Sequence, residues 1–84
     1  MTTPARLLGD AIHQARLSRG WSQADLLRAL GGQRTTAALW SWQNGNGIGI
    51  DALLEVIGAM PEVGDQVVML IRQAQHRRGA QPQP

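Results

Sequence analysis

The chain has 84 residues, which is enough for one small domain. It contains no cysteine, which excludes disulfides and cysteine-based zinc sites, and it has no long apolar run or signal-peptide core, so we expect a cytoplasmic protein without a membrane segment. The formal net charge of +2 is unevenly spread: residues 1–34 carry +3, residues 35–71 carry −4 and residues 72–84 carry +3.

The first predicted helix covers residues 4–19. Thr3 and Pro4 are typical of an N-cap and a first helical residue, and Gly20 is typical of the residue that follows a helix. Apolar residues recur at i, i+3, i+4 and i+7 and form a single stripe: Leu8, Ala11, Ile12 and Ala15.

A second, shorter helix is predicted over residues 23–30. Ser22 is its expected N-cap, and Asp25 three residues later completes a shortened capping box. Gly31 and Gly32 end it, and its apolar face consists of Leu26, Leu27 and Leu30.

The third predicted helix is capped by Thr35 or Thr36 and runs to about Gln43. At 100° per residue one side of it, which we expect to face inward, carries Leu39, Trp42 and Gln43. The opposite side carries Ala37, Ser41 and Asn44, with Trp40 at the edge.

Two more helices complete an all-α domain of five helices that spans residues 1–78. Residues 50–59 carry a stripe of Ile50, Leu53, Leu54 and Ile57. A fifth helix starts at Pro61 and runs to about Arg77, with a stripe of Val63, Val67, Leu70, Ile71 and Ala74. Residues 79–84 are polar and short, which predicts a disordered tail.

Residues 6–60 resemble the Xre/Cro-type, or lambda-repressor-like, helix-turn-helix DNA-binding family. The resemblance rests on Arg16, on the run from Gly20 to Leu26, on Leu39, and on Trp42-Gln43-Asn44-Gly45. It implies a fold in which a short helix lies in the DNA major groove.

The resemblance also implies roles for individual residues. Gln23 and Asn44 would bind phosphates, and base edges would be read from the start and outer face of the third helix, by Thr35, Thr36, Ala37 and Ser41. An arginine–glutamate pair often braces such folds, so Arg16 is expected to reach the end of the third helix, where Gln43 replaces the glutamate.

Three features depart from that family pattern. The turn from Leu30 to Thr36 is about two residues longer than usual, Leu27 stands where relatives have alanine, and residues 46–49 lack the basic residues that relatives often have. Arg28 and Arg34 near the turn supply positive charge instead, and Arg34 joins the expected DNA-binding set.

Two residue groups permit more than one interpretation. Trp40 can pack within the domain, contact DNA, or bind a protein partner, because exposed tryptophan is enriched at interfaces. The stripe of the fifth helix can close the core, form a homodimer contact, or do both.

The sequence therefore predicts a sequence-specific binder of double-stranded DNA that regulates transcription, of phage, mobile-element or bacterial origin. The alternative is a protein-interaction module on the same fold that has lost DNA binding, which the acidic middle segment and Trp40 favour. We expect no enzymatic activity, small-molecule substrate, cofactor or metal, because His13 and His76 lack clustered partners and no serine has a suitable base.

Overall fold

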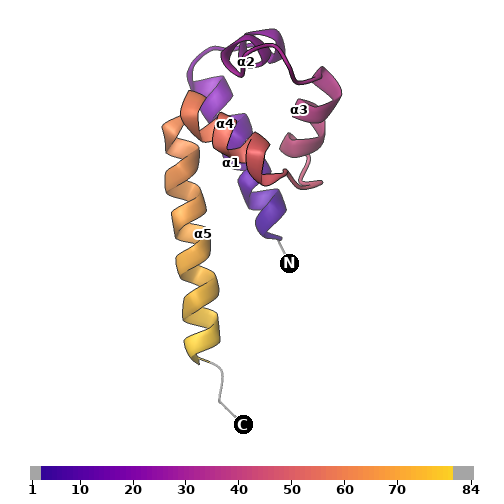
Figure 1. The fold of residues 1–84 in the computed structure, drawn as a ribbon. Coiled ribbons are helices and arrows are strands. Elements are labelled where there is room, and N and C mark those ends of the chain that lie inside the picture. Colours follow the sequence, from indigo (N-terminus) through magenta and orange to yellow (C-terminus); the bar gives the residue numbers. More distant parts are fainter. Residues whose placement is uncertain (1–2, 81–84) are drawn as a thin grey trace.

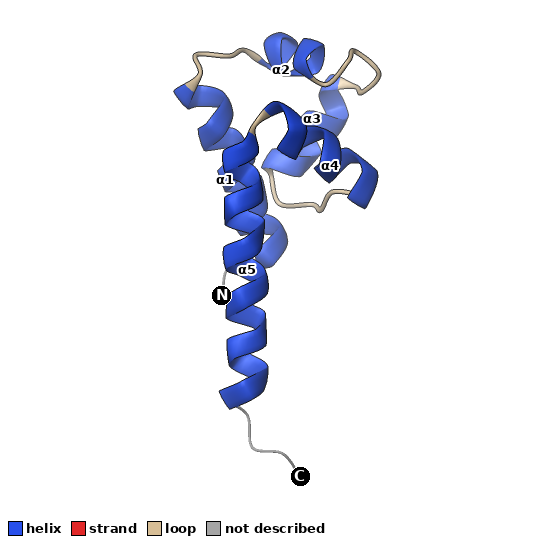
Figure 2. Ribbon diagram, turned by 60° about the vertical axis from the view of Figure 1, so that its left-hand side comes forward, coloured by secondary structure: helices blue, strands red, loops and turns tan. Residues whose placement is uncertain are grey.

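The protein is described by a computed structural model that covers residues 3–80, with side chains for residues 3–76. Five helices follow one another: α1 (Pro4–Ser18), α2 (Gln23–Ala29), α3 (Thr36–Gln43), α4 (Ile50–Ala59) and α5 (Pro61–Ala80). Within residues 3–80 there is no strand, so the predicted all-α class is confirmed (Figure 2). In Figure 1, α2 and α3 lie at one end of the molecule, while α5 runs away from it.

Local capping explains where the first three helices begin. The hydroxyl of Thr3 accepts from the Arg6 backbone N–H at 3.2 Å, and that of Thr35 accepts from Ala38 at 3.0 Å. Ser22 and Asp25 form the reciprocal capping box that the sequence predicted. The predicted bounds of these helices are confirmed to within one residue, and Thr35 rather than Thr36 is the cap of α3.

A single hydrophobic core joins all five helices. It consists of buried residues from each helix: Ile12 and Ala15 of α1, Leu26 and Leu30 from α2 and its C-cap, Leu39 and Trp42 of α3, Ala52, Val56 and Met60 from α4 and its C-cap, and Val63 of α5. Trp21 and Leu27 pack against this core while remaining half-buried. Trp42 is thus a core residue as expected, whereas Trp21 lies at the margin of the core.

The helices α1 and α3 approach each other closely at Gly9. A Cβ atom placed on Gly9 would lie 2.3 Å from the carbonyl oxygen of Trp42, so only glycine allows this crossing. The contact matters for function because α1 supports the inner side of α3 and leaves its outer side free.

The predicted inward face of α4 is wrong in part. Ile50 and Leu54 belong to the predicted stripe, yet they are exposed, while Ala52 and Val56 are buried. Leu53 and Ile57, the other two residues of the predicted stripe, are half-buried and pack against the core, so the helix is rotated relative to the predicted face. Tertiary packing, and not the size of the apolar side chains, therefore sets the rotation of α4.

The helix α5 is longer and less buried than the sequence predicted. It continues to Ala80, so Gly79 does not end it, and the first two residues of the expected tail, Gly79 and Ala80, are helical instead. Gly79 costs only about 1 kcal/mol relative to alanine, too little to stop a helix that has already propagated this far. Residues 81–84, the rest of the predicted disordered tail, lie outside the described residues.

Only the first half of α5 joins the core. Val63 is fully buried, Val67 and Leu70 are half-buried, and Ile71 and Ala74 of the same predicted stripe are exposed. The molecule is consequently elongated, with extents of 49 × 21 × 20 Å.

Candidate nucleic-acid interface

The outer side of α3 is a free surface. Thr36 and Ala37 are exposed, Ser41 is partly exposed, and Trp40 has 61% of its surface open to solvent. The inner side carries the three residues that the sequence placed there, Leu39, Trp42 and Gln43, and each is buried. The predicted division of α3 into an inner and an outer face is confirmed.

Arg16 and Gln43 connect the inner end of α3 to α1. Nε of Arg16 donates to Oε1 of Gln43 at 3.1 Å, and Nη1 of Arg16 donates to the Trp21 carbonyl at 2.8 Å. Both side chains are about nine-tenths buried. The expected contact between Arg16 and Gln43 is therefore confirmed, and Arg16 also holds the segment that leads into α2.

The side-chain amide of Gln43 has a defined orientation. Its Oε1 faces Arg16, which can only donate, and its Nε2 lies 3.0 Å from the Leu39 carbonyl, which can only accept. Nε2 also donates to Oε1 of Gln23 at 2.9 Å. The oxygen of the Gln23 amide is therefore directed at Gln43, and its NH2 group is left to donate elsewhere.

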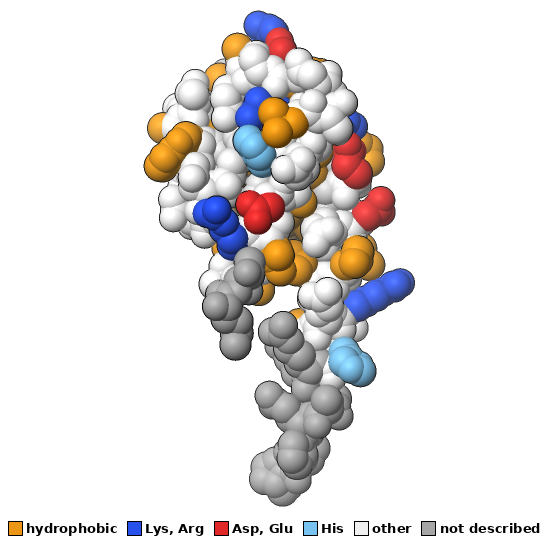
Figure 3. Space-filling view, turned by 180° about the vertical axis from the view of Figure 1, so that it is seen from behind, with side chains coloured by type: hydrophobic (Ala, Val, Ile, Leu, Met, Phe, Trp, Pro, Cys, Tyr) orange, Lys and Arg blue, Asp and Glu red, His pale blue; other side chains and the backbone are white. Residues whose placement is uncertain are grey.

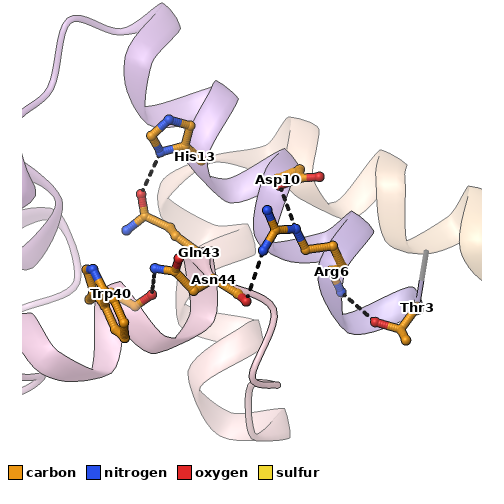
Figure 4. A network of polar contacts seen from close by, with 7 residues as sticks. All are labelled: Thr3, Arg6, Asp10, His13, Trp40, Gln43 and Asn44. Atoms are coloured by element: carbon orange, nitrogen blue, oxygen red, sulfur yellow. Dashed lines mark hydrogen bonds and ion pairs between the residues drawn. The ribbon is translucent and has the colours of Figure 1, made fainter. Parts of the chain in front are cut away.

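His13 completes this polar network from α1. Its Nδ1 lies 3.1 Å from Oε1 of Gln43, which accepts only, so the contact is a hydrogen bond when Nδ1 carries the proton (Figure 4). Nη2 of Arg16, which can only donate, lies 3.3 Å from the same Nδ1, so the contacts of His13 with Gln43 and with Arg16 require opposite tautomers of the ring. A lone histidine carries no local signal for a contact with a residue 30 positions away, so this role of His13 is not predictable from the sequence.

Asn44 and Arg6 lie at the C-terminal end of α3. Nδ2 of Asn44 donates to the Trp40 carbonyl at 2.7 Å, which uses one of its two N–H groups. Nη1 of Arg6 donates to the Asn44 carbonyl at 3.2 Å, and Nε of Arg6 lies 3.6 Å from the carboxylate of Asp10 (Figure 4). Arg6 is thus a cation beside the predicted interface that sequence reasoning did not include in the site.

These polar groups surround an open pocket of about 300 Å³ between α1, α2 and α3. Its lining residues come from all three helices and the C-cap of α3: Arg6, Asp10, His13, Gln23, Trp40, Gln43 and Asn44. The pocket brings Gln23, Trp40 and Asn44 of the predicted set together. Thr35, Thr36, Ala37 and Ser41 lie on α3 outside this lining, and Arg34 lies in the preceding turn.

Arg34 is engaged with α4. It forms an ion pair with Glu55, and its guanidinium lowers the pKa of that carboxyl, while Glu55 raises the pKa of Arg34. No local pattern indicates this partner, which is 21 residues away along the chain. Arg34 therefore anchors the long turn before α3, and only part of its charge is available to an anion.

Three other arginines around α1–α3 are also in ion pairs, whereas the hydrogen-bond partners of Arg16 in the described chain include no carboxylate. Arg6 lies beside Asp10, Arg19 beside Glu62, and Arg28 beside Asp25. Asp25 has a lowered pKa, chiefly because the Ser22 backbone N–H donates to its carboxylate. These ion pairs offset part of the positive charge beside α3, which limits the attraction that this surface has for phosphates.

Comparison with known proteins gives no match: no family model, no curated protein and no solved structure resembles the chain significantly. Across the part of the chain that the structure describes, no group of three or more metal-binding side chains is present. None of the described helices is both long and apolar enough to cross a bilayer.

Proposed function

We propose that this protein is a sequence-specific regulator of transcription of the Cro/repressor type, which binds double-stranded DNA through α3. It would act in the cytoplasm and come from a bacterium, a phage or a mobile element. The observation that carries the proposal is the outer face of α3, whose side chains are not part of the buried core. Two side-chain amides with N–H groups left to donate lie beside the C-terminal end of this helix. One is the NH2 group of Gln23, and the other is the second N–H of the Asn44 amide.

Positioning and reading would be divided between different residues. Gln23 and Asn44 both lie beside the C-terminal end of α3, where they would bind phosphates and fix the register of the helix on the duplex. Thr36, Ala37 and Ser41 would touch base edges, where methyl groups meet thymine and hydroxyls bond to either purine. None of the three makes the bidentate contact of arginine with guanine, so discrimination per base pair should be shallow.

Thr35, Arg34 and Trp40 would take supporting parts. Thr35 caps α3 and so holds the first turn that approaches the bases. Arg34 would reach a phosphate only by sharing its charge with Glu55. Trp40 is exposed beside the pocket and would pack along a sugar or base edge.

Selection of bound sequences from a random duplex pool tests the proposal directly. We expect an enriched motif a few base pairs long, and binding to it should weaken log-linearly with salt, with a gentle slope because few phosphates are neutralised. Gln23→Ala should weaken all sequences about equally, whereas Ser41→Ala or Thr36→Ala should change the preference at one or two base pairs.

Gln73→Ala supplies the matched control, because it removes an exposed glutamine amide from α5, away from α3. It should leave DNA affinity unchanged. An unenriched pool, together with no salt-dependent binding to any duplex, would refute DNA recognition.

A second function is favoured by one specific observation, the exposure of Trp40. With 61% of its surface open and the nearby arginines paired, the face of α3 also suits a protein partner. In that case the fold would serve as a protein-interaction module without DNA binding. Failure of the duplex selection, combined with loss of a partner's binding in Trp40→Ala and not in Gln23→Ala, would favour this alternative.

A further inference from the structure

The polar pocket beside the C-terminal end of α3 contains an ion pair that the DNA contacts proposed above do not include. Nε of Arg6 lies 3.6 Å from Oδ1 of Asp10, four residues further along α1, and the two side chains are 54% and 55% exposed. Both residues line the pocket together with Gln23 and Asn44. A cation and an acid therefore open onto the same space as two side-chain amides that donate hydrogen bonds.

The side chain of Arg6 is held against the turn that follows α3. Its Nη1 donates to the Asn44 carbonyl at 3.2 Å, and a Cβ atom placed on Gly45 would lie 3.0 Å from Cδ of Arg6. Gly45 has a φ of 81°, and this glycine lets the backbone of the turn approach the stem of the arginine closely. Figure 4 shows the guanidinium between Asp10 and Asn44. Two of its five N–H groups point at these partners, so others can donate to a further acceptor.

The charges around this pocket favour an anion. Arg16 reaches two of the lining residues: its Nε donates to Oε1 of Gln43 at 3.1 Å, and its Nη2 lies 3.3 Å from Nδ1 of His13. No carboxylate is among the hydrogen-bond partners of Arg16 within residues 3–76. Arg6 and Arg16 thus contribute two positive charges near a pocket whose lining contains one acid, Asp10.

The surface of this protein makes individual arginines important. Figure 3 shows basic side chains standing singly on one face of the molecule, several of them beside acidic ones. The number of phosphates that a protein neutralises sets the sequence-independent part of its DNA affinity. On such a surface that number depends on which single arginines exchange an acidic partner for a phosphate.

We infer that Arg6 binds one phosphate of the DNA backbone in this pocket, beside the amide of Asn44, and that Asp10 competes with this phosphate for the guanidinium. The inference rests on the DNA-binding function proposed above. Without DNA, Arg6 faces the carboxylate of Asp10. In the complex its guanidinium binds the phosphate through charge-assisted hydrogen bonds, while Asp10 repels the same phosphate. The pair therefore sets how tightly the protein holds any duplex at a given salt concentration, without favouring one sequence.

The test measures binding of the duplex enriched by the selection described above, over a series of salt concentrations. Arg6→Gln should weaken binding roughly threefold to tenfold and reduce the slope of log affinity against log salt by about one, because one phosphate is no longer neutralised. Asp10→Asn should strengthen binding roughly threefold to tenfold at low salt, and this gain should shrink as salt screens the removed charge. The gain should also be smaller when Arg6 is already glutamine, because the two residues act on one phosphate.

Arg19 and Glu62 supply the matched control. They form an ion pair that also contains an arginine of α1, but neither of them lines the pocket. Arg19→Gln and Glu62→Gln make the same changes of charge and should alter DNA affinity less than about twofold. Circular dichroism should show all four variants folded, because both ion pairs lie at the surface.

A second measurement identifies the phosphate itself. The same duplex is prepared with a single uncharged methylphosphonate linkage, placed at one position after another. One position should weaken binding of the wild type and have little effect on Arg6→Gln, because that variant has already lost the contact.

The outcomes separate this inference from the function on which it rests. If the wild type binds the duplex and Arg6→Gln binds it equally well, or if Asp10→Asn weakens binding, the inference is overturned and the DNA-binding function stands. An equal loss in Arg19→Gln and Arg6→Gln also overturns it, because net charge alone is then responsible. A wild type that binds no duplex refutes the proposed function and this inference together.

Discussion

Replacing Arg16 by alanine should destabilise the protein strongly, although Arg16 lies outside the proposed DNA contact. Its guanidinium makes a 3.1 Å bond to Oε1 of Gln43 and a 2.8 Å bond to the Trp21 carbonyl, and only 9% of the residue is exposed. A hydrogen bond to a charged group contributes about 1.5–3 kcal/mol when it is shielded, and the two bonds share one side chain, so their effects do not simply add. We expect Arg16→Ala to cost about 2–4 kcal/mol.

Urea unfolding followed by tryptophan fluorescence measures this cost. For a domain of this size the free energy of unfolding falls by roughly 1 kcal/mol per molar urea, so the midpoint should drop by about 2 M or more. Arg16→Lys should give an intermediate value, because lysine keeps the charge and loses the planar fork that reaches both acceptors.

Arg28→Ala is the matched control for this measurement. Arg28 is an arginine in an ion pair with Asp25, but its side chain is 73% exposed, so solvent screens the interaction and its removal should have little effect. If Arg16→Ala lowers the midpoint no further than Arg28→Ala does, Arg16 behaves as a solvated side chain and does not brace α3.

Three other outcomes follow from the same structure. Gly9→Ala should lower the free energy of unfolding by about 1–3 kcal/mol, because the added Cβ would lie 2.3 Å from a carbonyl oxygen of α3. Gly58→Ala is the control: its Cβ meets nothing within 4 Å, so it should raise the free energy of unfolding by roughly 0.5–1 kcal/mol in the same urea titration. Gln43→Glu should leave stability within about 1 kcal/mol, because a stronger bond to arginine offsets the lost bond to a carbonyl. Gln43→Glu should nevertheless weaken DNA binding roughly tenfold or more, because the side-chain amide of Gln23 would turn around to donate to the new carboxylate. If Gln43→Glu weakens binding equally in a Gln23→Ala background, the added charge alone is responsible. Acid should destabilise the protein, because arginine partners lower the pKa values of Glu55 and Glu62 below the ordinary 4.5. The two ion pairs therefore stabilise the fold at neutral pH, and this contribution is lost as the pH falls through the lowered values. A profile of unfolding free energy against pH that stays unchanged when both are replaced by glutamine would contradict this.

Much of the helical framework follows from local signals in the sequence. Capping residues such as Thr3 and Ser22 mark the starts of helices because they satisfy backbone N–H groups within the same few residues. Periodicity correctly placed Leu39 and Trp42 inside, because a short helix between two turns has only one face that can reach the core.

The errors arise where several apolar faces compete for one small core. In α4 the helix is rotated so that Ala52 and Val56 are buried and Leu53 and Ile57 pack at the edge of the core, which leaves Ile50 and Leu54 exposed. The stripe of α5 is a regular pattern in the sequence, and the exposure of its residues after Leu70 depends on where the other helices pack.

The exposed and buried sides of α3 were predictable from the sequence, and the partners of the charged residues around it were not. The sequence indicated which side of α3 is free, but partners of charged residues lie far along the chain, as with Arg34 and Glu55. Pairs of that kind depend on the tertiary fold and leave no local pattern. The count of arginines therefore overstated the positive charge that the surface offers.

The separation of the two faces of α3 has an evolutionary consequence. The fold depends on Leu39, Trp42 and Gln43, and none of the outward side chains at positions 36, 37, 40 and 41 makes a side-chain hydrogen bond or ion pair with the rest of the described chain. Substitutions at those four positions can accumulate with little loss of stability, so selection is free to act on what the surface binds. A duplicated copy of this domain could thus acquire a new target through a few outward changes while the helices beneath keep the same packing.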